Sequence, residues 1–447
     1  MVVDDFFGML DDNEAIGASD IMDIGVGRII SSTNLQAKQI VDKIEHYMKN
    51  GSDFYPVGSS CCLNTQTDKT FGDWRLQYLL MADNRDDGRF VEIDGEGQYS
   101  IAQQSNPEIN FNKAYMDSYP KVVTAGGERF PAMVSAIDAN IQRGVLVANY
   151  IGHGGEAGLA DERVVSIDQI NSWSNINALP LFVSATCEFT RFDDPERVSA
   201  GELVFLNPTG GAIAMLTTTR AVYIGINTTV GIELMERIFN RYPDGTAYEF
   251  GELSRRTKNA ASASSSNKRS FTLIGDPALR LAMPRYKIVT DSINGQNPTV
   301  QMDTLRALSK ARVKGHIEDY NGNILTTWNG TLTPTIFDKP KLQNTLAQDE
   351  ESPQIQFEQQ TSKIYRGQSS IVNGYFDFEF IVPKDIALNM DYGKISYYGH
   401  NGVFDAQGFD TSFYVGGIDP NGVQDVSGPE ISLFMNQEGF VNGSITD

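Results

Sequence analysis

Hydrophobic residues follow two different patterns along this 447-residue chain. In the first 283 residues, four short runs are apolar at nearly every position, at 75–81, 145–151, 181–185 and 212–216. Such runs are typical of strands buried on both faces of a parallel sheet. Between them, apolar residues recur every three to four positions, which predicts helices. The alternation predicts an α/β domain whose mostly parallel sheet carries helices on both faces.

For three of these helices, the sequence predicts where one end lies. The first begins near Asn34, a residue that favours the N-cap position. The second ends before Gly144, which has the role that glycine commonly takes just after a helix. The third is expected after Thr228.

The pattern changes after Pro284. Phe376, Phe378 and Phe380 alternate with acidic residues, which is the period-two pattern of a half-buried strand. Similar short strands are separated by turn dipeptides such as Asn321-Gly322. This spacing predicts a β-sandwich, here of the immunoglobulin-like (Ig-like) kind.

These patterns predict three units. They are an α/β domain at 1–283, a β-sandwich at 284–418 and the truncated start of a further β-module at 419–447. The polar stretch 338–352 predicts a surface loop. Because the strand expected at 430–435 has no partner left in the sequence, we expect the chain to be an internal part of a longer protein.

The charge balance excludes one class of partner. The chain has 57 Asp and Glu residues against 36 Lys and Arg, a net charge of -21. Nucleic acids and anionic lipid surfaces need clustered cations, so we expect no nucleic-acid partner.

No apolar run reaches the roughly 18 residues of a membrane helix. Three cysteines give no disulfide framework, because Cys61 and Cys62 are neighbours and Cys187 stands alone.

Two of the predicted strands end in chemically reactive residues. The run 145–151 leads into Gly152-His153-Gly154, and the run 181–185 leads into Thr186-Cys187. The carboxyl ends of parallel strands meet at one edge of a sheet, where sites form. An imidazole beside a thiol favours the nucleophilic thiolate. The backbone amides of Gly154 and Cys187 are then candidates for an oxyanion hole.

A purely structural interpretation of these residues stays open at this point. A cysteine at the end of a strand is often a small buried hydrophobe, and a histidine flanked by glycines is often a loop residue.

The two motifs resemble those of a known family. The segments 149–155 and 185–189 are similar to the His and Cys motifs of the gingipain-like cysteine peptidases, whose fold is caspase-like. Further segments resemble more specifically the sortases of the type IX secretion system of Bacteroidota. They are 4–8, 27–28, 190–195, 199–203, 217–220, 271–281, 382–386 and 428–431.

The resemblance implies a function and its residues. It implies a cysteine endopeptidase and transpeptidase on the extracellular face of the outer membrane of a Gram-negative bacterium. Its partners would be secreted cargo proteins with C-terminal signal domains, an anionic lipopolysaccharide that accepts the cargo, and other surface proteins of the system. Cys187 would be the nucleophile and His153 its base. No cofactor is required for that chemistry.

One part of the family pattern is expected to be missing. In such proteins a carboxylate from an earlier strand orients the histidine, and the matching segment would precede Asp4. We therefore expect this sequence to lack the third catalytic residue.

Other acidic residues are candidates for binding. Asp83, Asp86 and Asp87 form an acidic loop, to which calcium would be suited, with a solvated turn as the alternative. Asp5 falls where gingipains hold a specificity-pocket acid, so it is a candidate substrate contact.

Glu156 and Glu188 lie beside the two motifs and are further candidates for substrate contacts.

Two other functions remain open from the sequence. One is a gingipain-like protease whose only acceptor is water, and the other is a non-catalytic caspase-like surface scaffold or adhesin.

Overall fold

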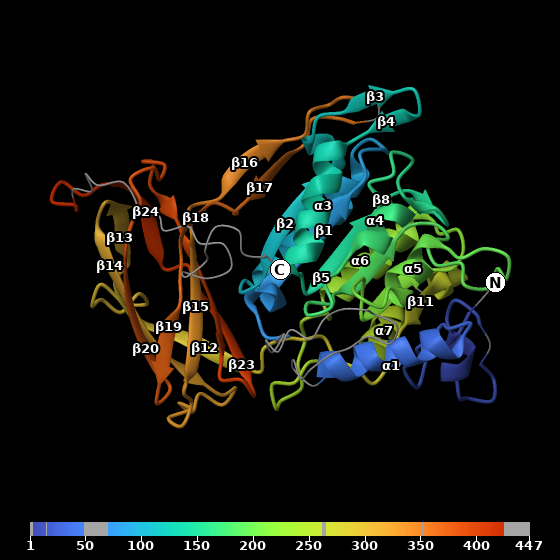
Figure 1. Cartoon of the computed structure of the whole chain (residues 1–447), viewed down its shortest axis with the longest axis horizontal. Coiled ribbons are helices and arrows are strands. Elements are labelled where there is room, and N and C mark those ends of the chain that lie inside the picture. The colour runs from blue at the N-terminus through green and yellow to red at the C-terminus, as the bar shows by residue number, and fades with distance from the viewer. Residues whose placement is uncertain (1–2, 15, 49–69, 262–264, 351, 424–447) are drawn as a thin grey trace, which may run out of the picture.

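A six-stranded sheet organises the first part of the chain, with the strand order β11-β10-β9-β5-β1-β2 (Figure 1). All neighbouring strands run parallel except β10 and β11. The computed structural model describes residues 3–14, 16–48, 70–261, 265–350 and 352–423. The strands are β1 (Gln77–Ala82), β2 (Asn110–Tyr115), β5 (Val147–Ile151), β9 (Leu181–Ala185), β10 (Ala214–Thr218) and β11 (Phe271–Ile274).

Helices cover both faces of this sheet. Alternate residues of β1 belong to separate core clusters, with Tyr78 and Leu80 in one and Leu79 and Met81 in the other. The first cluster includes side chains of α6 and α7, and the second includes side chains of α3 and α5. This confirms the predicted α/β fold. The helices are α1 (Asn34–Met48), α2 (Glu96–Ser105), α3 (Pro131–Arg143), α4 (Ile167–Ser172), α5 (Ala200–Leu206), α6 (Ile224–Met235) and α7 (Phe250–Ala260).

The predicted helix ends differ in accuracy. The helix α1 begins at Asn34, and α3 ends before Gly144, whose φ of +92° suits glycine. The helix α6 begins at Ile224, so Thr228 lies inside it and the predicted start was wrong.

Short elements complete the α/β part. The strands are β3 (Val122–Thr124), β4 (Gly127–Arg129), β6 (Gly154–Gly155), β7 (Gly158–Leu159) and β8 (Val165–Ser166). A π-helical turn covers Phe90–Gly95, and 3-10 turns cover Asp5–Gly8, Asp73–Leu76, Met116–Ser118 and Ser266–Ser270.

The chain after residue 285 is built from strands, as predicted, but the main sheet closes on itself. The order is β18-β15-β19-β20-β14-β12-β23-β22, and β22 also pairs with β15. This closed sheet is barrel-like, and it shares one hydrophobic core with a second sheet, so the predicted β-sandwich class is confirmed in this barrel-like form. A three-stranded sheet, β13-β24-β21, packs beside it. The strands are β12 (Tyr286–Ile293), β13 (Asp303–Ala307), β14 (Lys310–Glu318), β15 (Gly330–Phe337), β18 (Lys363–Arg366), β19 (Ser369–Val372), β20 (Tyr375–Ile381), β21 (Asp391–Tyr392), β22 (Lys394–His400), β23 (Asp405–Asp410) and β24 (Phe413–Ile418).

Residues 338–360 form an arm that leaves the barrel and returns to it (Figure 1). The arm contains the paired strands β16 (Lys341–Asn344) and β17 (Gln356–Gln359). Its residues Ile355 and Phe357 belong to a core cluster of the α/β part. The surface loop predicted at 338–352 is right about exposure for most of the described residues, but Lys341–Asn344 forms the strand β16 and the stretch is hydrogen-bonded to the α/β part.

Some predictions fall outside the described residues. Cys61, Cys62 and the strand expected at 430–435 lie there, as does most of the predicted module at 419–447. The predicted unit boundaries stay predictions. Within the described ranges, no helix is long and apolar enough to cross a membrane.

Candidate active site

The carboxyl ends of three neighbouring strands bring the candidate residues to one edge of the sheet. In the ladder, Ile151 of β5 pairs with Ala82 of β1 on one side and with Ala185 of β9 on the other. His153 and Cys187 each follow two residues after these paired positions. The sheet order therefore brings the His and Cys motifs to the same edge, as the sequence predicts.

The backbone of His153 is held from both sides. The carboxylate of Asp83 accepts a hydrogen bond from the His153 amide at 2.9 Å, and the Tyr150 hydroxyl donates to the His153 carbonyl at 2.7 Å. Gly152 makes this possible, because a Cβ there would lie 2.3 Å from the Cβ of Asp83. Burial raises the pKa of Asp83, and the hydrogen bond from the His153 amide opposes that rise.

The imidazole of His153 contacts a second carboxylate. Asp86 Oδ2 lies 2.7 Å from His153 Nε2, and the ring of Phe90 meets the imidazole edge to face at 5.5 Å. Asp83, Asp86 and Phe90 all belong to residues 83–90, which we call the acid loop. The expectation that the chain lacks a carboxylate for the histidine is therefore wrong. Asp86 and Asp87 stay partly open to water, as in the solvated-turn alternative, but Asp86 also contacts the imidazole.

Sequence reasoning placed Asp86 in an acidic loop but missed its contact with His153, although a signal for it exists. The acid loop follows the end of β1, just as His153 and Cys187 follow β5 and β9. The strand-end rule that selects the His and Cys motifs also selects this loop.

Cys187 is half-buried and packs against the core of the α/β part. Its thiol donates to the carbonyl of Val222 at 3.7 Å. Within the described part of the chain, no hydrogen bond joins this thiol to His153. The two loops nevertheless touch, because a Cβ on Gly154 would lie 2.8 Å from the hydroxyl of Thr186.

Glu156 and Glu188 border the two motifs differently. Glu156 forms ion pairs with Arg191 at 2.6 Å and with Arg197 at 3.3 Å. Glu188 has a positive φ of 49°, and its amide donates to the carbonyl of Arg220. Glu156 thus links the segment after His153 to Arg191 and Arg197. Glu188 forms part of the turn that follows Cys187.

Asp5 has a different environment from the one predicted. Its carboxylate is 4% exposed and pairs with Lys258 at 2.5 Å and with Arg269 at 3.1 Å. Both cations are as deeply buried as Asp5 itself. Because its oxygens are engaged inside the protein, these contacts contradict the prediction of a substrate contact.

The acid loop does not form a metal cluster. Asp83 accepts hydrogen bonds from backbone amides, including that of Asn84 at 2.7 Å, and Asp86 contacts the imidazole. Among the described residues, no group of three or more His, Cys, Asp or Glu side chains is placed to hold a metal ion.

Comparisons with known proteins give the family. Among solved structures, the Arg-specific cysteine proteinase gingipain R (RgpB) has 14% identity and a TM-score of 0.47, over 92% of this chain and 79% of its own. The complex of Porphyromonas gingivalis RgpB pro- and mature domains also has 14% identity and a TM-score of 0.47, over 91% of this chain and 81% of its own. Dimeric latent PorU from Porphyromonas gingivalis has 23% identity and a TM-score of 0.36, over 99% of this chain.

This chain covers 34% of the PorU chain. No curated protein matches the sequence. The family model described as Peptidase family C25 matches residues 1–282, which is more than half of the chain. The chain therefore belongs to Peptidase family C25, the gingipain family of cysteine peptidases.

Proposed function

We propose that the chain carries the catalytic centre of a sortase. This enzyme would remove the C-terminal signal domain of a secreted protein and join the new carboxyl end to an anionic lipopolysaccharide. The observation that carries the peptidase part is the contact of Asp86 with His153, beside the strand β9 that leads to Cys187. A nucleophile, a base and a group that orients the base are what such chemistry needs.

In the proposed first half-reaction, His153 takes the proton of the Cys187 thiol. Because Asp86 contacts Nε2, the nitrogen that accepts the proton is Nδ1. The thiol turns from the Val222 carbonyl towards the imidazole before this transfer. The thiolate then attacks the scissile carbonyl, and the amides of Gly154 and Cys187 stabilise the oxyanion.

The tetrahedral intermediate collapses when the imidazolium gives its proton to the leaving amine. The C–N bond breaks, and a thioester remains on Cys187. An amine of the lipopolysaccharide then attacks the thioester, which forms an amide and restores the thiol. Water attacking the same thioester would give a free carboxylate.

The transpeptidase part rests on sequence segments that resemble type IX sortases in both the α/β part and the barrel. On this proposal the enzyme acts on the extracellular face of the outer membrane, with cargo and other surface proteins of the system as partners. The chemistry itself requires no cofactor. Glu156 and Glu188 are proposed to contact the substrate chain near the nucleophile.

The site assignment is tested by labelling with a cysteine-directed probe. In the chain with all three cysteines, peptide mapping should find the label on Cys187 ahead of Cys61 and Cys62, and preferential labelling of Cys61 or Cys62 would count against the assignment. Cys187→Ala should abolish cleavage of a cargo signal-domain substrate and leave the fold intact. Retained cleavage in Cys187→Ala or His153→Ala would refute the assignment.

The acceptor is tested separately. The unlabelled, active chain is given the same substrate together with an amine acceptor, and the released cargo end is analysed by mass spectrometry. An aminolysis product alongside the hydrolysis product supports the sortase. A free carboxylate alone, even with saturating lipopolysaccharide, favours a protease that uses only water. Failure of any cleavage and labelling would favour the non-catalytic scaffold.

A further inference from the structure

The arm from the barrel reaches the acid loop. The side-chain amide of Asn84 donates to Asp349 Oδ2 at 3.0 Å, and the Ser352 hydroxyl donates to the Asn84 carbonyl at 2.6 Å. Asn84 and Ser352 are buried, with 3% of each residue exposed. The arm therefore holds the first turn of the loop through one buried hydrogen bond, from Ser352, and one partly buried hydrogen bond, to Asp349.

The arm also packs against the far end of the same loop. A Cβ on Gly88 would lie 2.4 Å from the Cδ1 of Ile355 and 2.9 Å from the Cγ of Pro353. Asp86, which contacts His153, lies between these two points of support. A shift of the arm would therefore reach Asp86 through either end of the loop.

The loop needs support because its backbone is strained. Asp86, Asp87 and Gly88 have consecutive positive φ angles of 58°, 52° and 74°. Residues other than glycine disfavour this region, and such conformations persist only where the surroundings enforce them. Besides the arm, Arg85 supports the loop through ion pairs with Asp161 and Glu162 of the α/β part.

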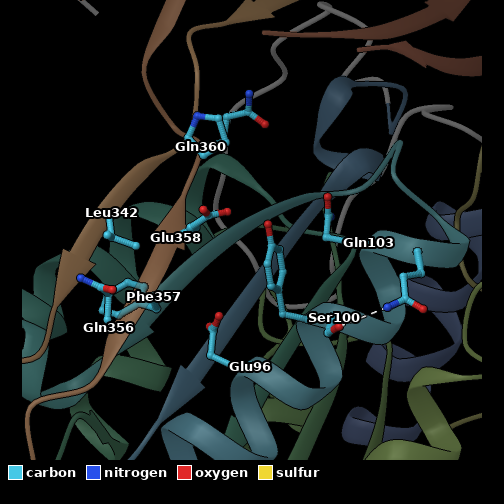
Figure 2. A pocket seen from close by; sticks show the side chains of 11 residues that line it. Glu96, Ser100, Gln103, Leu342, Gln356, Phe357, Glu358 and Gln360 are labelled. Atoms are coloured by element: carbon cyan, nitrogen blue, oxygen red, sulfur yellow. Dashed lines mark hydrogen bonds between the residues drawn. The ribbon is translucent and has the colours of Figure 1, made fainter. Parts of the chain in front are cut away.

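The arm itself is anchored next to these contacts. Asp117 accepts hydrogen bonds from the amides of Ala347 at 2.7 Å and Gln348 at 3.2 Å, and Lys121 pairs with Asp349. A cavity separates part of the hairpin of the arm from α2. Figure 2 shows Glu96 and Gln103 of α2 on one side of a cavity of about 690 Å³, which is lined on the other side by arm residues. The tip of the arm is thus anchored to the α/β part at the place where it meets the acid loop.

We propose that Asp349 and Ser352 are positioning residues of the peptidase site. They hold the acid loop so that Asp86 meets His153, which couples the barrel to catalysis in the α/β part. This inference rests on the proposed roles of His153 and Cys187. It predicts that the arm acts through Asp86 and not through overall stability.

The test measures the alkylation rate of Cys187 by iodoacetamide as a function of pH. It uses the full chain in the Cys61→Ser/Cys62→Ser background. A thiolate stabilised by an imidazolium reacts below neutral pH, where a free thiol is protonated. Ser352→Ala and Asp349→Ala should each lower the rate at pH 6 by about three- to ten-fold, the range that loss of one or two hydrogen bonds gives.

Asp86→Asn should lower the same rate at least as much. Adding Ser352→Ala to Asp86→Asn should then change it little, because both changes remove one contact. Ser352→Thr keeps the hydroxyl and should restore the wild-type profile. Arg366→Ala is the matched control, since it removes another contact of the barrel with the α/β part, the exposed pair with Asp73. It should leave the profile unchanged.

The outcomes separate this inference from the proposed function. If His153→Ala and Asp86→Asn change the profile but the Ser352 and Asp349 variants do not, the arm has no positioning role. Equal, additive losses in the Asp86→Asn background would also overturn it. If His153→Ala itself leaves the profile unchanged, the proposed catalytic pair is wrong.

Discussion

Replacing Asp5 by Asn distinguishes a structural acid from a substrate contact. Asp5 is the only carboxylate that the described contacts place on both Lys258 and Arg269, whose side chains are 2% and 0% exposed. Burial and neighbouring cations lower the pKa of the nearby Lys268, and the Asp5 carboxylate opposes that effect. Removing the negative charge leaves three buried or half-buried cations together.

The expected cost can be worked out from this burial. Breaking a buried ion pair by removing one partner costs about 3–5 kcal/mol. Asn keeps the size of Asp and one acceptor oxygen, so we expect about 3 kcal/mol. At roughly 2–4 °C per kcal/mol, the melting temperature of the α/β part should fall by about 6–12 °C.

The assay combines thermal melting with hydrogen exchange. Exchange should increase in peptides of α7 (Phe250–Ala260) and the neighbouring Ser266–Ser270 turn, and stay unchanged in the barrel. Asp4→Asn is the matched control, because its partner Arg28 has a side chain that is 38% exposed. Because the Asp4 side chain is itself only 8% exposed but its partner reaches water, that change should cost less than Asp5→Asn. A normal melting temperature for Asp5→Asn, with weaker binding of peptide substrates, would refute the structural role and restore the substrate contact.

Three further predictions follow from buried groups. Lys43→Met should destabilise the fold by roughly 3 kcal/mol in a denaturant titration, because the Lys43 ammonium donates to three backbone carbonyls in the interior, whereas Lys38→Met on the exposed side of α1 should cost little. Burial lowers the pKa of Lys394 from 10.5 to about 7, so its unfolded form binds a proton between these values. The free energy of unfolding should therefore fall as the pH drops from 10 to 7, and an unchanged slope in Lys394→Met would contradict this assignment. Gly152→Ala should reduce turnover by about 10²-fold with a smaller effect on melting, because its Cβ would push against Asp83 beneath the histidine; near-normal turnover would argue against a precisely held imidazole.

The sequence predicts the central sheet well because burial on both faces leaves a clear mark. The strands β5 and β9 are short and apolar throughout, so the placement of His153 and Cys187 at their ends follows from the sequence. The strand β2 at the edge of the sheet was missed, because Asn110, Asn112 and Lys113 interrupt both an apolar run and a period-two pattern. An edge strand with polar side chains looks like a loop when only local patterns are used.

Contacts between distant positions explain the other differences. Asn84 and Asp349 are 265 positions apart, so the stretch 338–352 looks solvated when its composition alone is considered. Asp5 meets Lys258 and Arg269 only after folding, so its burial has no local signal. Closure of the barrel likewise depends on the pairing of β15 with β22, which strand spacing does not determine.

The contact between His153 and Asp86 is too weak to hold the acid loop in its conformation. The side chains of His153 and Asp86 are 45% and 34% exposed, and an ion pair this open to water contributes about 0–1 kcal/mol. A positive φ at a residue such as Asp86 or Asp87 costs about 1–2 kcal/mol. The pair cannot hold its own loop in place, so the buried contacts of Asp83 and of the arm must supply the difference. Changes to those contacts should therefore reduce catalysis before they unfold the protein.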